Sequence, residues 1–320
     1  MVHWLRKMCA ATMSFCALTL VLAGATAAQA PFQPALPVSV PDTLWEPLRE
    51  HHDVRLQSAL ESRLRSHKKW ASLIEQERMA VGVVDLADPG NARFAGVNGD
   101  VMMYAASLPK IAILLTAMQQ IEDGKLRKTN AVMRDLNDMI RVSNNQAATR
   151  MIDRVGGLAA IDEVLQDPRY RFFDPANGGG LWVGKRYAKT GARYPDPILG
   201  LSHAATATQV SRFYYLVAEG RLINRERSRE MLEILSDPGI DHKFVNALRR
   251  VAPRAKLFRK SGSWKNWHSD SVLVWGPDWR RYIVVCLVED PNGERIIRDL
   301  IPEIETVLRP RARHIGDSAE

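Results

Sequence analysis

The chain is poor in cysteine, with three among its 320 residues. Cys9 and Cys16 lie in an apolar segment near the start, so Cys286 is the only one in the rest of the chain, and one cysteine forms no intramolecular disulfide. Cys286 stands in the strand-like run Tyr-Ile-Val-Val-Cys-Leu-Val, which is typical of a small buried hydrophobic residue. The sequence therefore predicts neither a disulfide framework nor a cysteine nucleophile.

Histidines in metal-ligand spacing are also missing. His51-His52, His203 and His268 do not recur with cysteines or acids at intervals typical of a metal site. The stretch from Gly179 to Lys185 imitates a phosphate-binding loop, but Arg186 follows it where a Ser or Thr would hold magnesium. We expect no metal and no cofactor.

Long apolar runs are absent apart from residues 8–25, which follow Arg6 and Lys7 and precede small residues up to Ala30. This pattern predicts a signal peptide over residues 1–30, with cleavage after Ala27, Ala28 or Ala30, and an uncleaved anchor is the alternative. We expect a periplasmic or secreted protein with no stable membrane insertion after cleavage.

Negative charge is in deficit. The formal net charge is +8, and loss of residues 1–30 would remove Arg6 and Lys7 and lower it to +6. This balance suits an anionic partner such as a cell-wall polymer, a membrane surface or nucleic acid. The basic residues are scattered, and the cluster at 309–313 is interpreted as a solvated end, so we expect no nucleic acid and place a basic nucleic-acid binder last.

Helical and strand patterns alternate without an internal repeat or a clear linker. A Pro-rich lead-in at 31–43 is followed by helical spacing over 44–74, strands over 79–86 and 92–97, a long helical block, strands over 256–263, 271–276 and 282–288, and a helix over 294–308. Strands at both ends of a helical block predict an α+β fold in which a five-stranded antiparallel sheet is flanked by the terminal helices, with an inserted all-helical subdomain. We expect one monomeric catalytic domain over 44–310, with an α/β lobe (44–100 and 250–310), a helical lobe (101–249) and a tail at 311–320.

The stretch from Tyr104 to Met118 organises this block. Residues 111–118 are apolar on nearly every face, which predicts a helix buried at the centre of the domain, and Pro109 suits its first turn. Ser107 and Lys110 are three residues apart and share a face at that end. They are either a nucleophile beside a base or an ordinary cap beside a solvated lysine.

Two further motifs follow in order. Ser143-Asn144-Asn145 lies between two predicted helices, and Lys260-Ser261-Gly262 lies on the first strand after the helical block. With Ser107-x-x-Lys110, this set resembles the S-x-x-K, S-D-N and K-T-G motifs of class A β-lactamases and related D,D-peptidases, the penicillin-recognising serine hydrolases. The resemblance covers roughly residues 75–305 and includes the stretch from Ser143 to Ile152 and the Gly-Gly pair after it.

The resemblance implies a role for each motif residue. Ser107 would attack an amide carbonyl after Lys110, kept neutral by burial and by Lys260, takes its proton. Ser143 would pass a proton to the leaving nitrogen, and the N–H groups of Ser107 and Ser263 would form the oxyanion hole. The substrate-binding residues would be Asn145, facing an amide side chain, Lys260 and Ser261, facing a carboxylate, and the adjoining strand residues Gly262 and Ser263.

The chain departs from the family pattern in several places. Asn144 replaces Asp, Ser261 replaces Thr, and only 36 residues separate Ser107 from Ser143, fewer than in class A enzymes, which predicts a more open site. The glutamate that activates the deacylating water has no clear match. Asp174 in Phe173-Asp174-Pro175-Ala176-Asn177 is either its shorter replacement or part of an Asp-Pro turn.

Hydrolysis of a β-lactam is the first functional hypothesis. The alternatives are a D,D-peptidase or another amide or ester hydrolase of the cell wall, and a non-catalytic sensor that binds β-lactams or muropeptides. These hypotheses differ in the lifetime of the acyl-enzyme, which is short in a β-lactamase and long in a penicillin-binding protein. In each case the partner is a small molecule derived from or resembling peptidoglycan.

Overall fold

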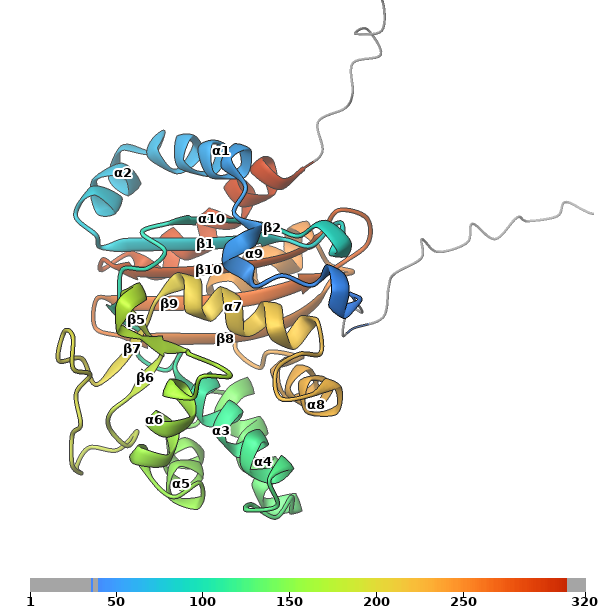
Figure 1. Ribbon diagram of the computed structural model, residues 1–320. Helices are drawn as coiled ribbons and strands as arrows, with labels where there is room; N and C mark the ends of the chain where they lie inside the picture. Colours follow the sequence, from blue (N-terminus) through green and yellow to red (C-terminus); the bar gives the residue numbers. More distant parts are fainter. Residues whose placement is uncertain (1–35, 37–39, 310–320) are drawn as a thin grey trace, which may run out of the picture. The chain divides into compact units, whose positions relative to one another are not determined.

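The computed structural model describes residue 36 and residues 40–309 of the chain. The predicted signal peptide (1–30), part of the lead-in and the tail at 311–320 lie outside these residues. Within the described part of the chain, no helix combines the length and the apolar character needed to cross a membrane. Figure 1 shows a sheet with helices on both faces.

The central sheet has five antiparallel strands in the order β2-β1-β10-β9-β8. Its strands are β1 (Met79–Asp85), β2 (Arg93–Val97), β8 (Lys256–Trp264), β9 (Trp267–Trp275) and β10 (Arg281–Glu289). Because β1 pairs with both β2 and β10, strands from the two ends of the chain share one sheet. The predicted α+β fold with a five-stranded antiparallel sheet is confirmed.

Alternating side chains divide the sheet into two buried faces. In β10, Tyr282, Val284 and Cys286 pack with one hydrophobic cluster, whereas Ile283 and Val285 pack with the other. The first face is covered by α1 (Val54–Arg65), α2 (Lys68–Glu75), α9 (Lys243–Val251) and α10 (Gly293–Leu308), and the second by α7 (Ala207–Ala218). Cys286 is a buried free thiol, as predicted, and burial raises its pKa.

The helical block lies between β2 and β8 in sequence. Its remaining elements are β3 (Met103–Tyr104), α3 (Lys110–Glu122), α4 (Asn130–Arg141), α5 (Asn145–Arg154), α6 (Leu158–Gln166), β4 (Phe173–Asp174), β5 (Gly179–Gly180), β6 (Trp182–Val183), β7 (His203–Ala205) and α8 (Arg225–Leu235). Every residue of α3 from Lys110 to Gln119 is buried, as expected for a helix without a polar face. This helix is the core of the block, and α4, α5, α6 and α8 pack around it.

Three local predictions differ from the structure. The helical pattern over 44–74 is broken into two short 3-10 turns, Asp42–Leu44 and Leu48–His51, followed by α1 and α2, because Pro47 and the Asp53 cap interrupt it. The inserted block, predicted to be all-helical, also contains the short strands β3, β4, β5, β6 and β7, which form two small sheets. Helix α9 was not predicted, although Phe244, Ala247 and Leu248 are buried at helical spacing.

Candidate active site

Ser107 lies in the turn that leads into α3. Ala106, the residue before it, has φ +50°, and the Lys110 N–H donates to the Ser107 carbonyl at 3.3 Å as the helix begins. Lys110 is therefore the first residue of a buried helix, and its side chain is fully buried. Ser107 itself is partly exposed, so its hydroxyl stands at the edge of the core.

The Lys110 amine connects the first motif to the second. Its Nζ donates to the carbonyl oxygen of Ser143 at 2.7 Å and to Oδ1 of Asn145 at 2.8 Å, and it lies 3.4 Å from the Ser143 Oγ. Ser143 has φ +58°, a conformation that costs free energy in a residue other than glycine. Asn144 caps α5 by accepting from the Ala147 N–H at 2.9 Å, so the replacement of Asp by Asn keeps the capping function.

Lys260 brings the third motif to the same serine. Its Nζ donates to the Ser143 Oγ at 2.9 Å and to the Ser261 carbonyl oxygen at 2.6 Å. The next residue but one, Gly262, lies against the nucleophile's turn. A Cβ at Gly262 would come within 2.3 Å of the Ala105 carbonyl oxygen and 2.6 Å of the Ser107 nitrogen. The structure thus brings Ser107, Lys110, Ser143, Asn145, Lys260 and Gly262 together at one place.

Burial controls the charge of both lysines. It lowers the pKa of Lys110 to about 7. It also holds the pKa of Lys260 well below its usual value, and the positive charge of Lys110 adds to that effect. A large fraction of Lys110 is therefore neutral near pH 7 and can accept a proton from a neighbouring hydroxyl.

The strand end that carries Ser261 and Ser263 is held by two residues that the sequence analysis did not single out. Lys243, the first residue of α9, donates to the Gly262 carbonyl at 2.6 Å and to the Ser263 Oγ at 2.8 Å. His242 Nε2 lies 3.3 Å from the Ser261 Oγ. Burial lowers the pKa of Lys243 to about 8 and that of His242 to about 4. In the sequence, only the helical spacing of the apolar residues Phe244, Ala247 and Leu248 indicates the helix that positions these two side chains.

A buried ion pair fixes the strands behind this site. The Arg259 guanidinium donates to both carboxylate oxygens of Asp270, at 2.7 and 3.0 Å, and the Phe244 N–H donates to the same carboxylate at 3.2 Å. Asp270 is fully buried opposite Ser261 in the β8–β9 pairing. The carboxylate thereby ties β8, β9 and the start of α9 together.

The long segment between β6 and β7 also reaches the site. The ring of Tyr187 faces the Lys110 amine, with 4.5 Å between Nζ and the ring centroid, and its hydroxyl donates to the Ala106 carbonyl at 3.1 Å. The sequence did not identify Tyr187 as a site residue. No local pattern marks it, because the segment has no periodicity.

Asp174 does not join these residues. It ends β4, and its carboxylate accepts from the Ala176 N–H at 3.1 Å and from the Asn177 amide at 2.9 Å. The negative charge of its carboxylate interacts with the guanidinium groups of Arg49 and Arg212, which are not among the site residues. The structure therefore shows the Asp-Pro turn that was the alternative interpretation. Within the described residues, no carboxylate forms a hydrogen bond or an ion pair with Lys110.

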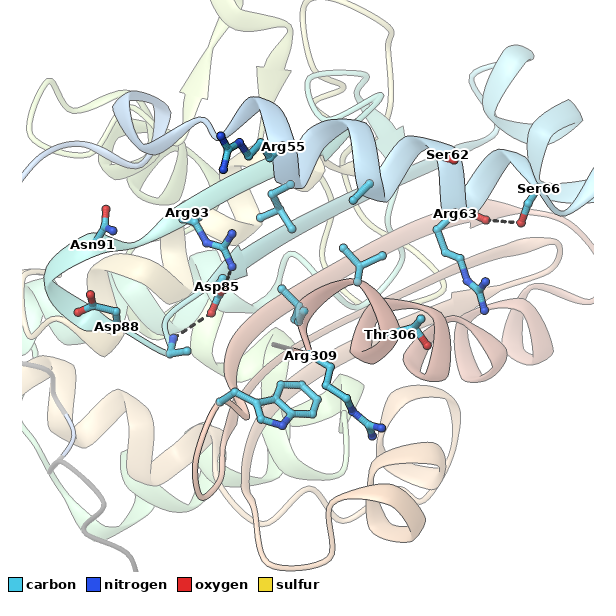
Figure 2. A pocket seen from close by; sticks show the side chains of 16 residues that line it. Arg55, Ser62, Arg63, Ser66, Asp85, Asp88, Asn91, Arg93, Thr306 and Arg309 are labelled. Carbon is cyan, nitrogen blue, oxygen red and sulfur yellow. Dashed lines mark hydrogen bonds and ion pairs between the residues drawn. The ribbon is translucent and has the colours of Figure 1, made fainter. Parts of the chain in front are cut away.

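A large cavity lies elsewhere. It has a volume of about 780 Å³ and is lined by α1, α10 and the β1–β2 hairpin (Figure 2). Its hydroxyl side chains are Ser62, Ser66 and Thr306, and the Ser66 hydroxyl donates to the Arg63 carbonyl as a helix-end residue. Arg93 pairs there with Asp85. Its carboxylates are already engaged, since Asp85 pairs with Arg93 and Asp88 accepts from the Gly90 N–H at 3.2 Å, and none of the three sequence motifs contributes to it among the described residues. Among residues 40–309, no group of three or more His, Cys, Asp or Glu is placed to hold a metal ion.

Comparisons with known proteins agree with the geometry. The model of the Beta-lactamase enzyme family matches residues 65–135 and 132–308. A search of curated proteins with this sequence finds no match.

Three solved structures illustrate the likeness in fold. The β-lactamase from Sphaerobacter thermophilus DSM 20745 has a TM-score of 0.59 and 18% identity over 78% of this chain and 95% of its own. PBP-A has a TM-score of 0.59 and 18% identity over 82% of this chain and 97% of its own. Its L158E mutant, with a TM-score of 0.59 and 19% identity over 82% of this chain and 98% of its own, was solved as an acyl-enzyme complex with penicillin G.

Proposed function

We propose that this chain, which belongs to the Beta-lactamase enzyme family, is a serine acyl hydrolase that attacks the amide of a β-lactam through Ser107. The observation that carries the proposal is that the Lys110 and Lys260 amines both donate hydrogen bonds to Ser143, next to the turn that contains Ser107. One partly exposed hydroxyl, one amine with a lowered pKa and one bridging hydroxyl are the groups that acyl transfer needs.

In the acylation step, the Ser107 Oγ forms a bond to the carbonyl carbon while its proton passes to neutral Lys110. The carbonyl oxygen becomes negative, and the N–H groups of Ser107 and Ser263 stabilise that charge. The C–N bond then breaks, and the leaving nitrogen receives a proton through the Ser143 hydroxyl. Lys110 and Lys260 both contact Ser143, so a proton taken from Ser107 has a short path to the leaving group.

The other predicted contacts concern the rest of the substrate. The Oδ1 of Asn145 accepts from Lys110, so its NH2 group remains to donate to an amide carbonyl of the substrate. Lys260 and the Ser261 hydroxyl form the wall for a carboxylate, and Lys243, whose pKa is about 8, adds positive charge at the same strand end near pH 7. This charge suits an anionic small molecule such as a β-lactam or a peptidoglycan-derived peptide. We also propose that the protein acts in the periplasm or after secretion.

A D,D-peptidase or penicillin-binding protein is the second candidate, and a specific observation favours it. Hydrolysis of the acyl-enzyme needs a base for the incoming water, and Asp174 is engaged in its own turn instead of contacting Lys110. With no carboxylate bonded to Lys110 in the described residues, deacylation is slow by this argument. PBP-A, of similar fold, was captured as a penicillin G acyl-enzyme in its L158E form. If the acyl-enzyme is never hydrolysed, the protein acts as a β-lactam or muropeptide sensor instead of an enzyme.

The purified full-length protein tests both candidates with a fluorescent penicillin and a chromogenic cephalosporin. We expect covalent labelling of the wild type, located at Ser107 by peptide mass, and no labelling of Ser107→Ala. Ser66→Ala is the matched control, because Ser66 lies in the large cavity away from the motifs and should label normally. Sustained turnover of the cephalosporin identifies a β-lactamase, and a stable adduct identifies a peptidase or sensor. Absence of both signals in folded wild-type protein contradicts the proposal.

A further inference from the structure

Tyr187 contacts the site on both sides of the nucleophile. The residue belongs to the irregular segment between β6 and β7, and its hydroxyl donates to the Ala106 carbonyl at 3.1 Å. Its ring faces the Lys110 Nζ, 4.5 Å from the centroid, within the range of a cation–π contact. The residue before Ser107 and the amine three residues after it are therefore both held by one side chain.

The contact with Ala106 bears on the Ser107 N–H. The Ala106 carbonyl and the Ser107 N–H are the two ends of one planar peptide unit, so fixing the carbonyl fixes the direction of the N–H. Ala106 has φ +50°, a conformation that must be stabilised by its surroundings in a residue with a side chain. The hydrogen bond from Tyr187 provides such support and also polarises the peptide toward a stronger N–H donor.

The Tyr187 ring packs against a second aromatic ring, that of His203. His203 lies with its ring centroid 4.4 Å from that of Tyr187, and its Nε2 is 3.0 Å from the Lys185 carbonyl oxygen. Burial lowers the pKa of His203 to about 4, so its ring is neutral at neutral pH. Burial also raises the pKa of the Tyr187 phenol well above its usual value, which keeps the donating proton in place. The segment thus presents a neutral aromatic wall to Lys110.

We propose that Tyr187 is a positioning residue of the Ser107 site, whose hydroxyl orients the Ala106–Ser107 peptide and whose ring shields the Lys110 amine from water. The proposal rests on the acyl-transfer function proposed above. In this proposal the long segment between β6 and β7 contributes to the site by carrying Tyr187.

The groups that face the Lys110 amine determine the expected pH effect. They are Ser143 and Asn145 near the start of α5, Lys260 from β8, whose own pKa is lowered, and the Tyr187 ring, which packs against neutral His203. The ring has two opposed effects, since it attracts an ammonium but also keeps water away. Burial is the cause of the low pKa of Lys110, so we expect exclusion of water to be the larger effect.

Three variants separate the two contacts. Tyr187→Phe keeps the ring and loses the hydroxyl, and Tyr187→Ala loses both. Tyr194→Ala is the matched control, because it removes an exposed tyrosine of the same segment. Each variant is assayed for its rate of labelling by fluorescent penicillin between pH 5 and 10.

We expect Tyr187→Phe to label about ten-fold more slowly at an unchanged pH midpoint, since loss of an oxyanion donor itself costs about 10²–10³. Tyr187→Ala is expected to shift the midpoint upward by one unit or more, because water then reaches Lys110. A rise of two units would lower the neutral fraction at pH 7 from about half to about one in a hundred. Tyr194→Ala should match the wild type in rate and midpoint.

A measurement without substrate separates this proposal from the function on which it rests. The ¹³Cε signal of Lys110, assigned by its loss in Lys110→Met, reports the pKa of the amine directly. A Lys110 pKa that is equal or lower in Tyr187→Ala overturns the shielding role, and a wild-type labelling rate in Tyr187→Phe overturns the orienting role. Failure of the wild type to label would contradict the acyl-transfer function while the lysine titration still decides the shielding role.

Discussion

The Nζ of Lys260 lies 2.9 Å from the Oγ of Ser143, although 117 residues separate the two along the chain. Lys110 contacts the backbone carbonyl of the same serine at 2.7 Å. Ser143 is thus held by two buried lysines, one from the central helix and one from the sheet. This arrangement connects the helical block to the sheet and places a hydroxyl where it can carry a proton between amines.

Replacement of Ser143 by Ala should slow acylation more than it affects folding. The variant removes the hydroxyl that relays a proton to the leaving nitrogen, and help of that kind is worth about 10²–10⁴ in rate. We expect the rate of labelling by fluorescent penicillin to fall within that range, with little change in the thermal midpoint. Labelling of Ser143→Ala at the wild-type rate would remove Ser143 from the proposed mechanism.

Lys110→Met should increase stability while it abolishes labelling. The folded-state pKa of Lys110 is about 7, below the usual value of about 10.4, so the unfolded chain binds more protons between these values. The charged lysine therefore destabilises the fold most below pH 7, and this destabilisation is relieved as pH rises toward 10. Allowing for unpaired partners left at Ser143 and Asn145, we expect Lys110→Met to gain about 1–3 kcal/mol at pH 6.

Urea unfolding at pH 6 and pH 9 measures the gain, and we expect it to be smaller at pH 9. Lys189→Met, at an exposed position, is the matched control and should change little at either pH. A Lys110→Met variant less stable than the wild type at pH 6 would contradict the lowered pKa.

Gly262→Ala should distort the nucleophile's turn. The added Cβ would approach the Ala105 carbonyl oxygen to 2.3 Å and the Ser107 nitrogen to 2.6 Å, and both are backbone atoms that cannot rotate away. Overpacking of this kind costs about 1–3 kcal/mol, and we expect labelling to slow by at least ten-fold. Gly90→Ala is the control, since its nearest neighbour would be the Asp88 Oδ1 at 3.7 Å. Normal labelling by Gly262→Ala would mean that Ser107 does not depend on this close approach.

Asp270→Asn should destabilise the protein strongly. The change keeps the size of the side chain but leaves the buried Arg259 guanidinium without a counter-charge, next to Lys260 and Lys243. Breaking a buried ion pair costs about 3–5 kcal/mol. Asp299→Asn, which breaks partly exposed pairs with Arg295 and Arg298, should cost less than about 1 kcal/mol. Similar losses for the two variants in chemical unfolding would contradict the structural role of Asp270.

Asp174→Asn should leave both labelling and turnover within about two-fold of the wild type, because the asparagine oxygen can still accept from the Ala176 N–H and only the exposed hydrogen bond from the Asn177 amide is lost. The two activities must be measured on one preparation, so that the ratio of deacylation to acylation is compared. Normal labelling with turnover reduced ten-fold or more would identify Asp174 as the base for the deacylating water, contrary to its position in the turn.

Local patterns account for the features that the sequence predicted well. The apolar run from Ile111 to Met118 requires a buried helix, and the five strand-like runs require a sheet that buries both faces. Each signal depends on neighbours a few residues away, so one-dimensional spacing is enough to detect it. The three motifs were found for the same reason, as each is a short string on one element.

The missed features depend on distant contacts. Tyr187 lies in a segment without periodicity, and its partner Lys110 is on another element. Lys243 reads as an ordinary helix-start lysine until α9 packs beside the end of β8. Asp174 shows the converse. Its place in the sequence resembles that of a catalytic glutamate, but its carboxylate accepts hydrogen bonds within its own turn.

The sequence by itself determined the order of elements, the buried helix and the identity of the residues that could carry acyl-transfer chemistry, since these follow from residue type and short-range spacing. Only the tertiary structure decided their protonation and their partners. The pKa of Lys110 is lowered because α3 is enclosed by the rest of the domain, and Ser143 is shared with Lys260 because the sheet packs against the helical block. Burial and long-range contact are properties of the folded chain, and they turn a serine and two lysines into a candidate active site.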